Sequence, residues 1–411
     1  MSLHPCRFCG AELRHTFADL GVTPLSNSYL TEEQLDRMEP FYPLHARLCE
    51  KCLLVQLPEY ESPENIFQDY AYFSSYSETW VAHARGYCED VAARFHLGPS
   101  SHVVEIASND GYLLRNFVER GVPVTGVEPA RNVAEAARAR GVPTVTDFFG
   151  QRLARELAAE GKQADLLLGN NVLAHVPDLN DFVAGLKILL KPDGVVTMEF
   201  PHLLRLIEGR QFDTIYHEHF SYFSFTTVER VFAAHGLTLF DVEELATHGG
   251  SLRIYARHEE DTGREVGRRV EELKAREQEA GMTRLETYLA FDERVRETKR
   301  ALLSFLVEAK RAGKRVAGYG APAKGNTLLN YCGVRTDFID YTVDANPHKQ
   351  NRYLPGTRIP IHRPDRLRET RPDYVLVLPW NLLEEITRQV AYVREWGGRF
   401  VVPVPEARVV E

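Results

Sequence analysis

His102-Val-Val-Glu-Ile-Ala-Ser-Asn-Asp-Gly111 reads as a short apolar strand followed by a turn of small residues, and a helix begins at Tyr112. The pattern continues along the chain, with further apolar strands at 122–128, 144–147, 165–171 and 195–200 separated by helical segments. Strands that alternate with helices favour a parallel sheet covered on both faces. The sequence therefore predicts an α/β fold for the centre of the chain.

Acidic residues stand where these strands end. Glu105 closes the first strand, Glu128 closes the second, and Asp147 with Phe148 follows the third. Ligands of open α/β sheets bind outside the carboxyl ends of strands, and a carboxylate placed like Glu128 can accept hydrogen bonds from ribose hydroxyls. This set resembles a class I S-adenosylmethionine methyltransferase, which implies a Rossmann-like domain. On this motif alone, a dehydrogenase or a cofactor-free α/β domain remains an alternative.

The resemblance implies a cofactor-binding set along these strand ends. Glu105, Ala107 and Gly111 would line the methionine end, Glu128 would take the ribose, and Asp147 with Phe148 would frame the adenine. Asn109 and Asn170 complete the set. Ala107 stands where most such enzymes have glycine, which puts the tight backbone approach in question.

Four of the six cysteines form two Cys-x-x-Cys pairs, Cys6/Cys9 and Cys49/Cys52. Each pair can present two thiolates to one tetrahedral zinc ion, and four protein ligands close such a site. The alternative, two redox couples, lacks the helix that usually follows them. We therefore predict structural zinc that folds a small N-terminal domain and takes no part in catalysis.

The 411 residues carry a net charge of -9, which argues against a nucleic-acid partner. No apolar run approaches the ~20 residues that span a bilayer, and the N-terminus lacks a signal-peptide pattern, so we expect a cytoplasmic protein without membrane contact. The expected division is a zinc-binding domain (1–62), a methyltransferase domain (63–262), a helical linker (263–312) whose charges are solvated, and a C-terminal α/β domain (313–411).

Tyr216-His-Glu-His219 is the densest group of titratable residues in the chain. Histidine is the commonest base near neutral pH, so this stretch is a candidate catalytic site. His175 follows the fourth strand, near the expected position of methyl transfer. His248 or Arg253, at a glycine turn, could also reach the site. Tyr72 and Tyr76 lie in a polar aromatic segment, either a lid that offers hydroxyls to a substrate or a loop packed on the next domain.

A second strand–turn–helix unit, Arg315-Val-Ala-Gly-Tyr-Gly-Ala-Pro-Ala-Lys324, resembles a cradle for nucleotide phosphates, with Lys324 available for a pyrophosphate. Two later strands also end in polar and basic groups. The sequence predicts a second Rossmann-like domain that binds a nucleotide sugar, or alternatively a polar rim without a ligand. The candidate residues are Lys324, Asn326, Asp344, Asn346, Lys349, Arg352, Trp380, Asn381 and, from the lid segment, Tyr76.

Taken together, the motifs Glu-Ile-Ala-Ser-Asn-Asp-Gly111, Asn-Val-Leu-Ala-His-Val-Pro177, Tyr-His-Glu-His219, Gly-Tyr-Gly-Ala-Pro-Ala-Lys324 and Pro-Trp-Asn381 with the cysteine pairs resemble the sugar C-methyltransferases of branched deoxysugar biosynthesis. The resemblance spans essentially the whole chain. It implies methylation at C3 of a 4-keto-6-deoxy sugar linked to a nucleotide, dTDP, by a monomeric enzyme.

By the same resemblance, His219 removes the C3 proton, and the resulting enolate takes a methyl group from S-adenosylmethionine. Glu218 orients nearby groups, while Tyr72, His175 and Tyr216 place the sugar and stabilise the enolate oxygen. Two other classes stay open: an O- or N-methyltransferase for another small molecule, and a zinc-containing nucleotide-sugar binder without catalytic activity.

Overall fold

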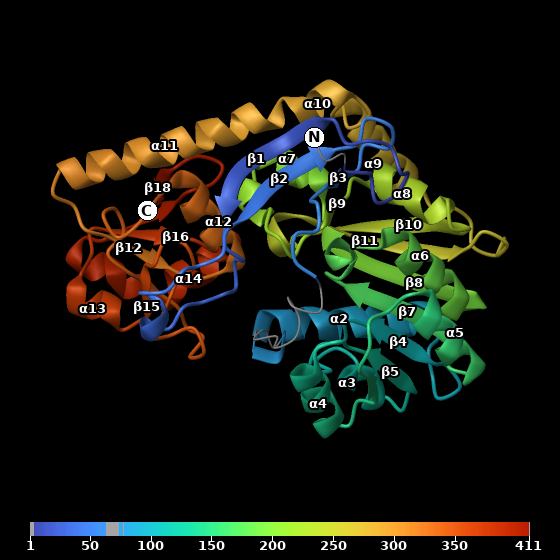
Figure 1. Cartoon of the computed structure of the whole chain (residues 1–411). Coiled ribbons are helices and arrows are strands. Elements are labelled where there is room, and N and C mark those ends of the chain that lie inside the picture. Colours follow the sequence, from blue (N-terminus) through green and yellow to red (C-terminus); the bar gives the residue numbers. More distant parts are fainter. Residues whose placement is uncertain (1–3, 63–73, 77, 411) are drawn as a thin grey trace.

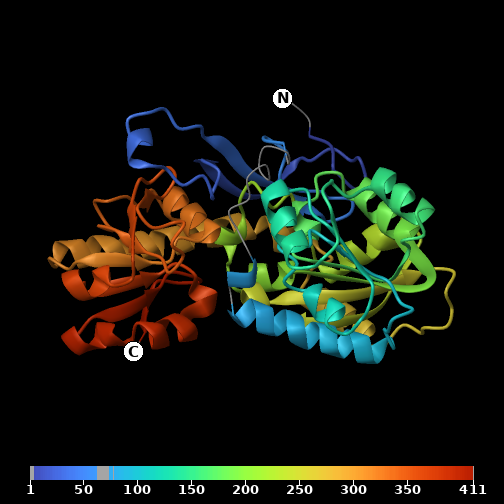
Figure 2. The same cartoon turned by 90° about the horizontal axis from the view of Figure 1, so that it is seen from below.

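The computed structural model describes residues 4–62, 74–76 and 78–410, which form three β-sheets, and α-helices accompany the two larger ones (Figure 1). Two seven-stranded sheets lie in the middle and at the C-terminal end of the chain, and a four-stranded sheet is built mainly from N-terminal strands. In Figure 2 the two large sheets with their helices lie side by side, and N-terminal segments extend along both.

The central sheet has the order β10-β11-β8-β7-β4-β5-β6. Its strands are β4 (Val103–Ile106), β5 (Val124–Val127), β6 (Thr144–Val145), β7 (Ala164–Asn170), β8 (Leu190–Pro201), β10 (Leu237–Leu245) and β11 (Ser251–His258). The five strands from β4 to β8 are parallel, because helices connect them, while β10 and β11 are antiparallel additions at one edge. The predicted parallel sheet is confirmed.

Helices cover this sheet as expected for a doubly wound fold. They are α2 (Glu78–Arg94), α3 (Arg115–Val118), α4 (Arg131–Ala139), α5 (Gln151–Ala159), α6 (Leu179–Leu189), α7 (Leu203–Glu208) and α8 (Phe225–Ala233). The apolar faces of α5 and α6 are buried together with the side chains of β4, β7 and β8 in one core. That core fixes the carboxyl ends of the parallel strands, where the site lies.

The N-terminal sheet joins this domain through a strand from the middle of the chain. Its order is β1-β2-β3-β9, with β1 (His15–Thr23), β2 (Tyr42–Leu48), β3 (Val55–Gln56) and β9 (Ser221–Tyr222). Val55 pairs with Tyr222, and Gln56 pairs with Ser221. Because only Phe220 separates His219 from β9, the N-terminal sheet holds one end of the histidine-containing segment.

The C-terminal sheet has the order β14-β15-β13-β12-β16-β17-β18. Its strands are β12 (Val316–Tyr319), β13 (Thr342–Val343), β14 (Arg352–Tyr353), β15 (Pro360–His362), β16 (Tyr374–Val377), β17 (Arg399–Val402) and β18 (Arg408–Val410), and its helices are α12 (Ala323–Cys332), α13 (Arg366–Thr370) and α14 (Leu383–Gln389). The strands β15, β13, β12, β16 and β17 are parallel. The second Rossmann-like unit is therefore present.

Three helices lie between the two large sheets in the sequence: α9 (Arg268–Glu279), α10 (Leu285–Leu289) and the long α11 (Phe291–Arg311), which spans the top of Figure 1. The prediction that their charges are all solvated is wrong for Glu277, whose side chain is fully buried. Its carboxylate accepts hydrogen bonds from the backbone N–H groups of Phe225 and Thr226 and pairs with His202 at 2.7 Å. Glu277 thus stabilises the first turn of α8.

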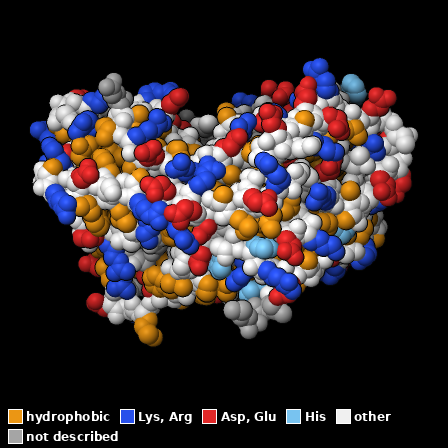
Figure 3. Space-filling view, turned by 90° about the horizontal axis from the view of Figure 1, so that it is seen from above, with side chains coloured by type: hydrophobic (Ala, Val, Ile, Leu, Met, Phe, Trp, Pro, Cys, Tyr) orange, Lys and Arg blue, Asp and Glu red, His pale blue; other side chains and the backbone are white. Residues whose placement is uncertain are grey.

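None of the helices within the described ranges is long and apolar enough to cross a membrane. The face of the molecule in Figure 3 carries basic and acidic side chains interspersed with one another.

Candidate active site

One cavity of about 680 Å³ collects side chains from all three sheets and their loops. Its lining begins at the strand ends of the central sheet and continues through the segment 214–219 to the start of α12. Residues 25, 27, 28 and 29 of the N-terminal part close another side. The three parts of the chain therefore share one site.

Glu128 lies at the cofactor end of the cavity, directly after β5. One carboxylate oxygen accepts a hydrogen bond from the backbone N–H of Asn109 (3.0 Å), and the other accepts one from Ala130 (2.9 Å). Burial raises the pKa of Glu128 to about 6, although these two N–H groups oppose the shift. The carboxylate is fixed in place and retains acceptor capacity for hydroxyl groups of a ligand.

The neighbouring cofactor candidates line the same end: Ala107, Asn109, Asp147, Phe148 and Asn170. Ala107 has a φ of 55°, in the left-handed region that favours glycine, which gives a physical reason for the glycine that related motifs carry there. Both polar atoms of the Asn170 side chain are buried without a hydrogen-bond partner in the described part of the chain. Buried polar atoms in proteins are almost always hydrogen-bonded, so these two can serve the polar groups of a ligand, and the lining fits S-adenosylmethionine.

Glu105 and Gly111 lie outside the cavity lining. Glu105 is 1% exposed, and its burial, with Glu128 and Asp110 nearby, raises its pKa well above the usual range. Gly111 has a φ of 75°, and a Cβ atom there would lie 2.8 Å from a methyl carbon of Val142. Both residues shape the turn after β4, and their contact with the cofactor stays a prediction.

His219 lies in the cavity wall between the cofactor end and the C-terminal domain. Its Nδ1 donates a hydrogen bond to the backbone carbonyl of Thr214 (3.0 Å), so Nδ1 carries the proton and Nε2 is the basic nitrogen. Burial, followed by the effect of His175, lowers the pKa of His219 well below its usual range. The imidazole is therefore neutral near pH 7 and able to accept a proton.

Two aromatic rings hold His219 in position. The Tyr216 ring lies over it with 4.0 Å between ring centroids, and the His175 ring meets it edge-on at 4.8 Å. Burial lowers the pKa of His175 to about 4, so this second imidazole is also neutral. Both neighbours line the cavity and can contact a substrate beside the base.

The structure separates the two histidines of the segment. His217 donates from Nε2 to the carbonyl of Pro43 (3.1 Å) and packs its ring edge against Tyr42 and Tyr60, away from the cavity lining. Glu218 lines the cavity instead, and burial raises its pKa to about 7. The sequence alone left open which of the two histidines faces the cavity, and the structure places His219 in its lining and His217 outside it.

His248 also lines the cavity, as one of the two possibilities at the glycine turn. Burial, followed by the charge of Lys324, lowers the pKa of His248 to about 4. Arg253, the other possibility, lies outside the lining and pairs at 2.9 Å with the buried Glu199. Arg253 is therefore part of the supporting structure.

The C-terminal candidates fall into two groups. Lys324 lines the cavity and donates to Asn381 Oδ1 (2.9 Å), with its ammonium 4.7 Å from the Trp380 ring centroid. Lys349 and Asn346 line the same cavity, and Lys349 donates to the carbonyl of Ala321 (2.9 Å).

The remaining C-terminal candidates face elsewhere. Asp344 accepts from the backbone N–H of Ala321 (2.7 Å) at the glycine turn. Asn326 is 1% exposed and donates to the carbonyl of Ser26, and Arg352 is exposed on β14. None of these three residues lines the cavity. Among the tyrosines, Tyr72 and the side chain of Tyr76 lie outside the described residues, as does most of the proposed lid.

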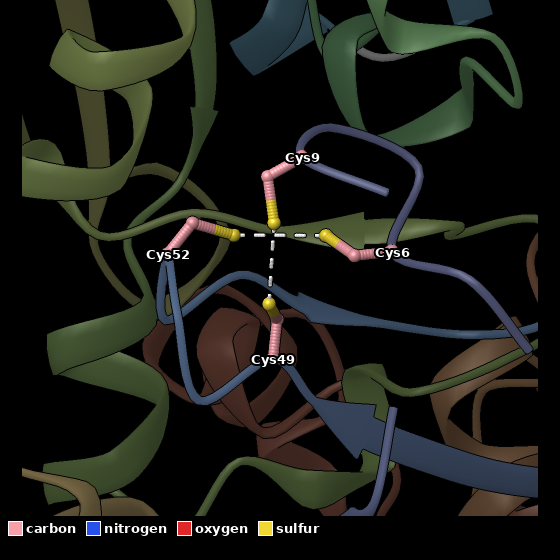
Figure 4. Close-up of side chains that lie close together, drawn as sticks. All are labelled: Cys6, Cys9, Cys49 and Cys52. Atoms are coloured by element: carbon pink, nitrogen blue, oxygen red, sulfur yellow. Dashed lines mark hydrogen bonds between the residues drawn. The ribbon is translucent and has the colours of Figure 1, made fainter. Parts of the chain in front are cut away.

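The four zinc candidates converge on one point (Figure 4). Their sulfur atoms all lie within 4.8 Å of one another, with Cys6–Cys52 at 3.6 Å and Cys9–Cys49 at 3.5 Å. Thiolates at about 2.3 Å from a tetrahedral zinc ion lie roughly 3.8 Å apart, so the four sulfurs fit zinc and are too far apart for disulfides. Gln56 of β3 donates to Cys6 Sγ (3.2 Å) and links the cluster to the strand that pairs with β9.

Three residues of the site escaped sequence reasoning. Asn27 donates to Glu218 Oε1 (2.7 Å), and the Tyr29 hydroxyl donates to the carbonyl of Ala321 (2.6 Å). Asp213 is fully buried and accepts from Trp380 Nε1 (2.7 Å). Asp213 lies three residues before the Tyr216–His219 stretch, but Asn27 and Tyr29 carry no local signal, because only the fold brings them near the cavity.

Family models match most of the chain. Residues 6–67 match "Putative zinc binding domain", residues 80–242 match "Methyltransferase domain", and residues 246–405 match "C-methyltransferase C-terminal domain". The α/β methyltransferase fold with a zinc-binding N-terminal domain is confirmed.

One relative matches over nearly its whole length. C-methyltransferase NovU of Streptomyces niveus is 38% identical over 408 residues, which cover 98% of this chain and 96% of that protein. A ubiquinone biosynthesis O-methyltransferase of Bartonella bacilliformis is 27% identical over only 25% of this chain and 42% of its own. The solved structure of PH0226 from Pyrococcus horikoshii OT3 covers 48% of this chain and 99% of its own at 17% identity, with a TM-score of 0.38, too low to bear on the site.

Proposed function

The chain belongs to the C-methyltransferase family and depends on S-adenosylmethionine. We propose that its acceptor is C3 of a 4-keto-6-deoxy sugar linked to a nucleoside diphosphate, with dTDP as the carrier. Methyl transfer to carbon needs a carbon nucleophile. A carbon next to a carbonyl becomes one when a base removes its proton, so a base in the cavity supports this class of acceptor.

The observation that carries the proposal is the fixed tautomer of His219. Its Nδ1 is committed to the Thr214 carbonyl, so Nε2 is the nitrogen that accepts a proton. His219 also lines the cavity that Glu128 shares at one end and Lys349 at the other. A base between a cofactor end and a cationic end suits a sugar that is methylated while its diphosphate extends toward the C-terminal domain.

In this proposal, bound S-adenosylmethionine supplies an electrophilic methyl group. His219 Nε2 takes the C3 proton, and the electrons of the C–H bond form an enolate with the C4 carbonyl. The C3 carbon then bonds to the methyl carbon as the methyl–sulfur bond breaks and S-adenosylhomocysteine leaves, the C4 carbonyl re-forms, and the imidazolium returns its proton to solvent. General-base assistance of this kind is worth typically ~10²–10⁴-fold.

The other cavity residues would bind and orient the sugar. Tyr216 and His175 flank the base and would contact the ring, as would Tyr72. Glu218 would orient the segment or a sugar hydroxyl, with Asn27 fixing its carboxylate. Lys349 and Asn346 would take the diphosphate, because an ammonium and an amide suit phosphate oxygens.

We also propose that the domains meet at residues 62, 262 and 312, that the protein is a monomer, and that it is located in the cytoplasm. The zinc ion would stabilise the N-terminal sheet and leave the chemistry to the cavity, since its four thiolates leave no open coordination position.

A panel of nucleotide-linked 4-keto-6-deoxy sugars, incubated with S-adenosylmethionine and read by mass spectrometry, tests the proposal. We expect one methyl group added to at least one member and none to the corresponding 4-hydroxy sugars, whose C3 proton is not acidified. Equal methylation of keto and hydroxy sugars would point to an O-methyltransferase. Binding of the panel without any methylation would point to a binding protein.

A further inference from the structure

Lys324 is held rigidly at the cavity wall. Its ammonium donates to Asn381 Oδ1 (2.9 Å) and lies 4.7 Å from the Trp380 ring centroid. Burial lowers its pKa, and Asp213 opposes that shift from beyond salt-bridge distance. The described part of the chain offers Lys324 no carboxylate within 4.0 Å, so its positive charge is not neutralised by a direct partner.

A buried support fixes the ring beneath this ammonium. Trp380 Nε1 donates to Asp213 Oδ2 (2.7 Å), and Asp213 is fully buried. Its other oxygen, Oδ1, is buried without a hydrogen-bond partner among the described residues. Burial raises the pKa of Asp213 to about 6. Burying a carboxylate that has only one hydrogen-bonded oxygen lowers the stability of the folded protein, which points to a role for Asp213 beyond stability.

The same segment connects Lys324 to the base. Asp213 precedes Thr214, whose carbonyl accepts the hydrogen bond from His219 Nδ1. Thr327 of α12 donates to the carbonyl of Ile215 (3.0 Å), so the helix that carries Lys324 is bonded directly to this segment. The charge of Lys324 also contributes to the low pKa of both His219 and His248, as expected for a cation near both rings.

The glycine turn before Lys324 differs from a phosphate cradle. The turn itself leaves a phosphate few backbone donors, because Asp344 Oδ2 accepts from Ala321 N (2.7 Å) and Gly320 N donates to the carbonyl of Val343 (2.6 Å). The backbone N–H groups left for an anion are those in the first turn of α12, from Ala323 to Gly325. Pro322 has no N–H to offer. Asp344 Oδ2 also lies 4.0 Å from the ammonium of Lys349, so a diphosphate bound by Lys349 would compete with this carboxylate. Lys349, which bonds the Ala321 carbonyl and lies 5.3 Å from the Tyr29 ring centroid, is the other cavity lysine.

We propose that Lys324 pairs with the enolate oxygen at C4 of the sugar, and that Lys349 takes the diphosphate; this inference rests on the function proposed above. As His219 Nε2 removes the C3 proton, the C–H electrons move into the C3–C4 bond and negative charge develops on the C4 oxygen. The Lys324 ammonium stabilises that charge without giving up a proton. The charge disappears when C3 bonds to the methyl carbon and the C4 carbonyl re-forms.

Two measurements separate the roles of Lys324 and Lys349: the rate of C3 proton exchange and the affinity for the diphosphate. The exchange assay is run in D₂O with S-adenosylhomocysteine in place of the donor, so no methyl group can be transferred. NMR follows the exchange of the sugar C3 proton at saturating sugar. Calorimetry gives the Kd of the nucleoside diphosphate alone. We expect Lys324→Met to slow exchange by ~10²–10³-fold, the usual cost of removing an oxyanion donor, with a Kd close to that of the wild type. Lys349→Met should show the opposite: a raised Kd and a normal exchange rate at saturation.

Wild-type-like exchange by Lys324→Met together with a raised Kd would overturn the assignment and return Lys324 to the diphosphate. If the wild-type enzyme itself neither exchanges the C3 proton nor methylates the sugar, the proposed function fails first. Lys324→Gln provides a second variant with a hydrogen-bond donor for Asn381, and calorimetry with S-adenosylhomocysteine verifies that each variant is folded. Trp380→Phe, which loses the bond to Asp213 but keeps a ring, should slow exchange less than Lys324→Met.

Discussion

Asn27 Nδ2 donates a 2.7 Å hydrogen bond to Glu218 Oε1, across 191 residues of sequence. This bond joins the N-terminal part of the chain to the segment that carries His219. The pairing of β3 with β9 holds the same segment from its other end. The zinc-binding part is therefore built into the wall of the active site.

Glu218→Gln should stabilise the protein in a pH-dependent way. Burial raises the folded-state pKa of Glu218 to about 7, above its unfolded value of about 4.3. The wild type therefore loses stability as pH rises between these two values, up to on the order of 3 kcal/mol, and the loss is constant above them. Gln keeps the acceptor for Asn27 and removes the buried charge. Urea unfolding at about pH 5.5 and pH 8 should show a larger gain at the higher pH. An equal effect at both would contradict the shift.

His219→Asn should lower turnover by ~10²–10⁴-fold, because it removes the basic Nε2 that the bond from Nδ1 to Thr214 leaves free to accept a proton. The Kd of S-adenosylhomocysteine should be unchanged. His217→Gln is the matched control, since His217 bonds Pro43 outside the cavity and Gln can donate the same bond. Turnover of both variants is measured by stopping the reaction at set times and counting the labelled methyl group transferred from S-adenosylmethionine. A His217 variant as slow as the His219 variant would reverse the assignment.

Glu128→Ala should weaken binding of S-adenosylhomocysteine by about 10–100-fold, the effect of losing a charged hydrogen-bond acceptor for hydroxyl groups. Turnover at saturating donor should fall less than the affinity. Glu156→Gln, an exposed carboxylate on α5, serves as the control and should bind normally. Isothermal titration calorimetry measures both affinities. Unaltered binding by Glu128→Ala would place the cofactor elsewhere.

Cys49→Ser should reduce the zinc content and the melting temperature together, because a closed four-thiolate site contributes folding free energy. Turnover should fall as well, since β3 follows the second cysteine pair and pairs with β9 next to His219. Atomic absorption, thermal unfolding and turnover assays check this. Full activity in protein that has lost its zinc would show that the N-terminal sheet does not position the base.

The sequence predicted those features that depend on local patterns. Strands alternating with helices predicted the parallel central sheet, and two Cys-x-x-Cys pairs predicted the four-sulfur cluster. Glu128 and Asn170 were found because parallel strands present their carboxyl ends at one edge. His219 was chosen over His217 only by family resemblance. Adjacent side chains point in different directions, and the carbonyl of Pro43 that holds His217 lies 174 residues away.

Features that depend on long-range contacts were missed. Glu277 looked like one more solvated charge of an amphipathic helix, and only the packing of α9 against α8 shows that it is buried. Asn27 and Tyr29 belong to a segment without motifs. The glycine turn before Lys324 resembles a phosphate cradle in sequence. In the structure, however, the backbone N–H of Ala321 in this turn already donates to Asp344, which follows β13.

The central claim is that the methyl group is transferred to a carbon activated by His219. The direct measurement uses methyl-¹³C-labelled S-adenosylmethionine with a nucleotide-linked 4-keto-6-deoxy sugar, followed by NMR of the product. We predict that the labelled methyl carbon correlates with C3 and with an intact C4 carbonyl, and that His219→Asn forms no such product. A label bonded to oxygen or nitrogen would contradict the account.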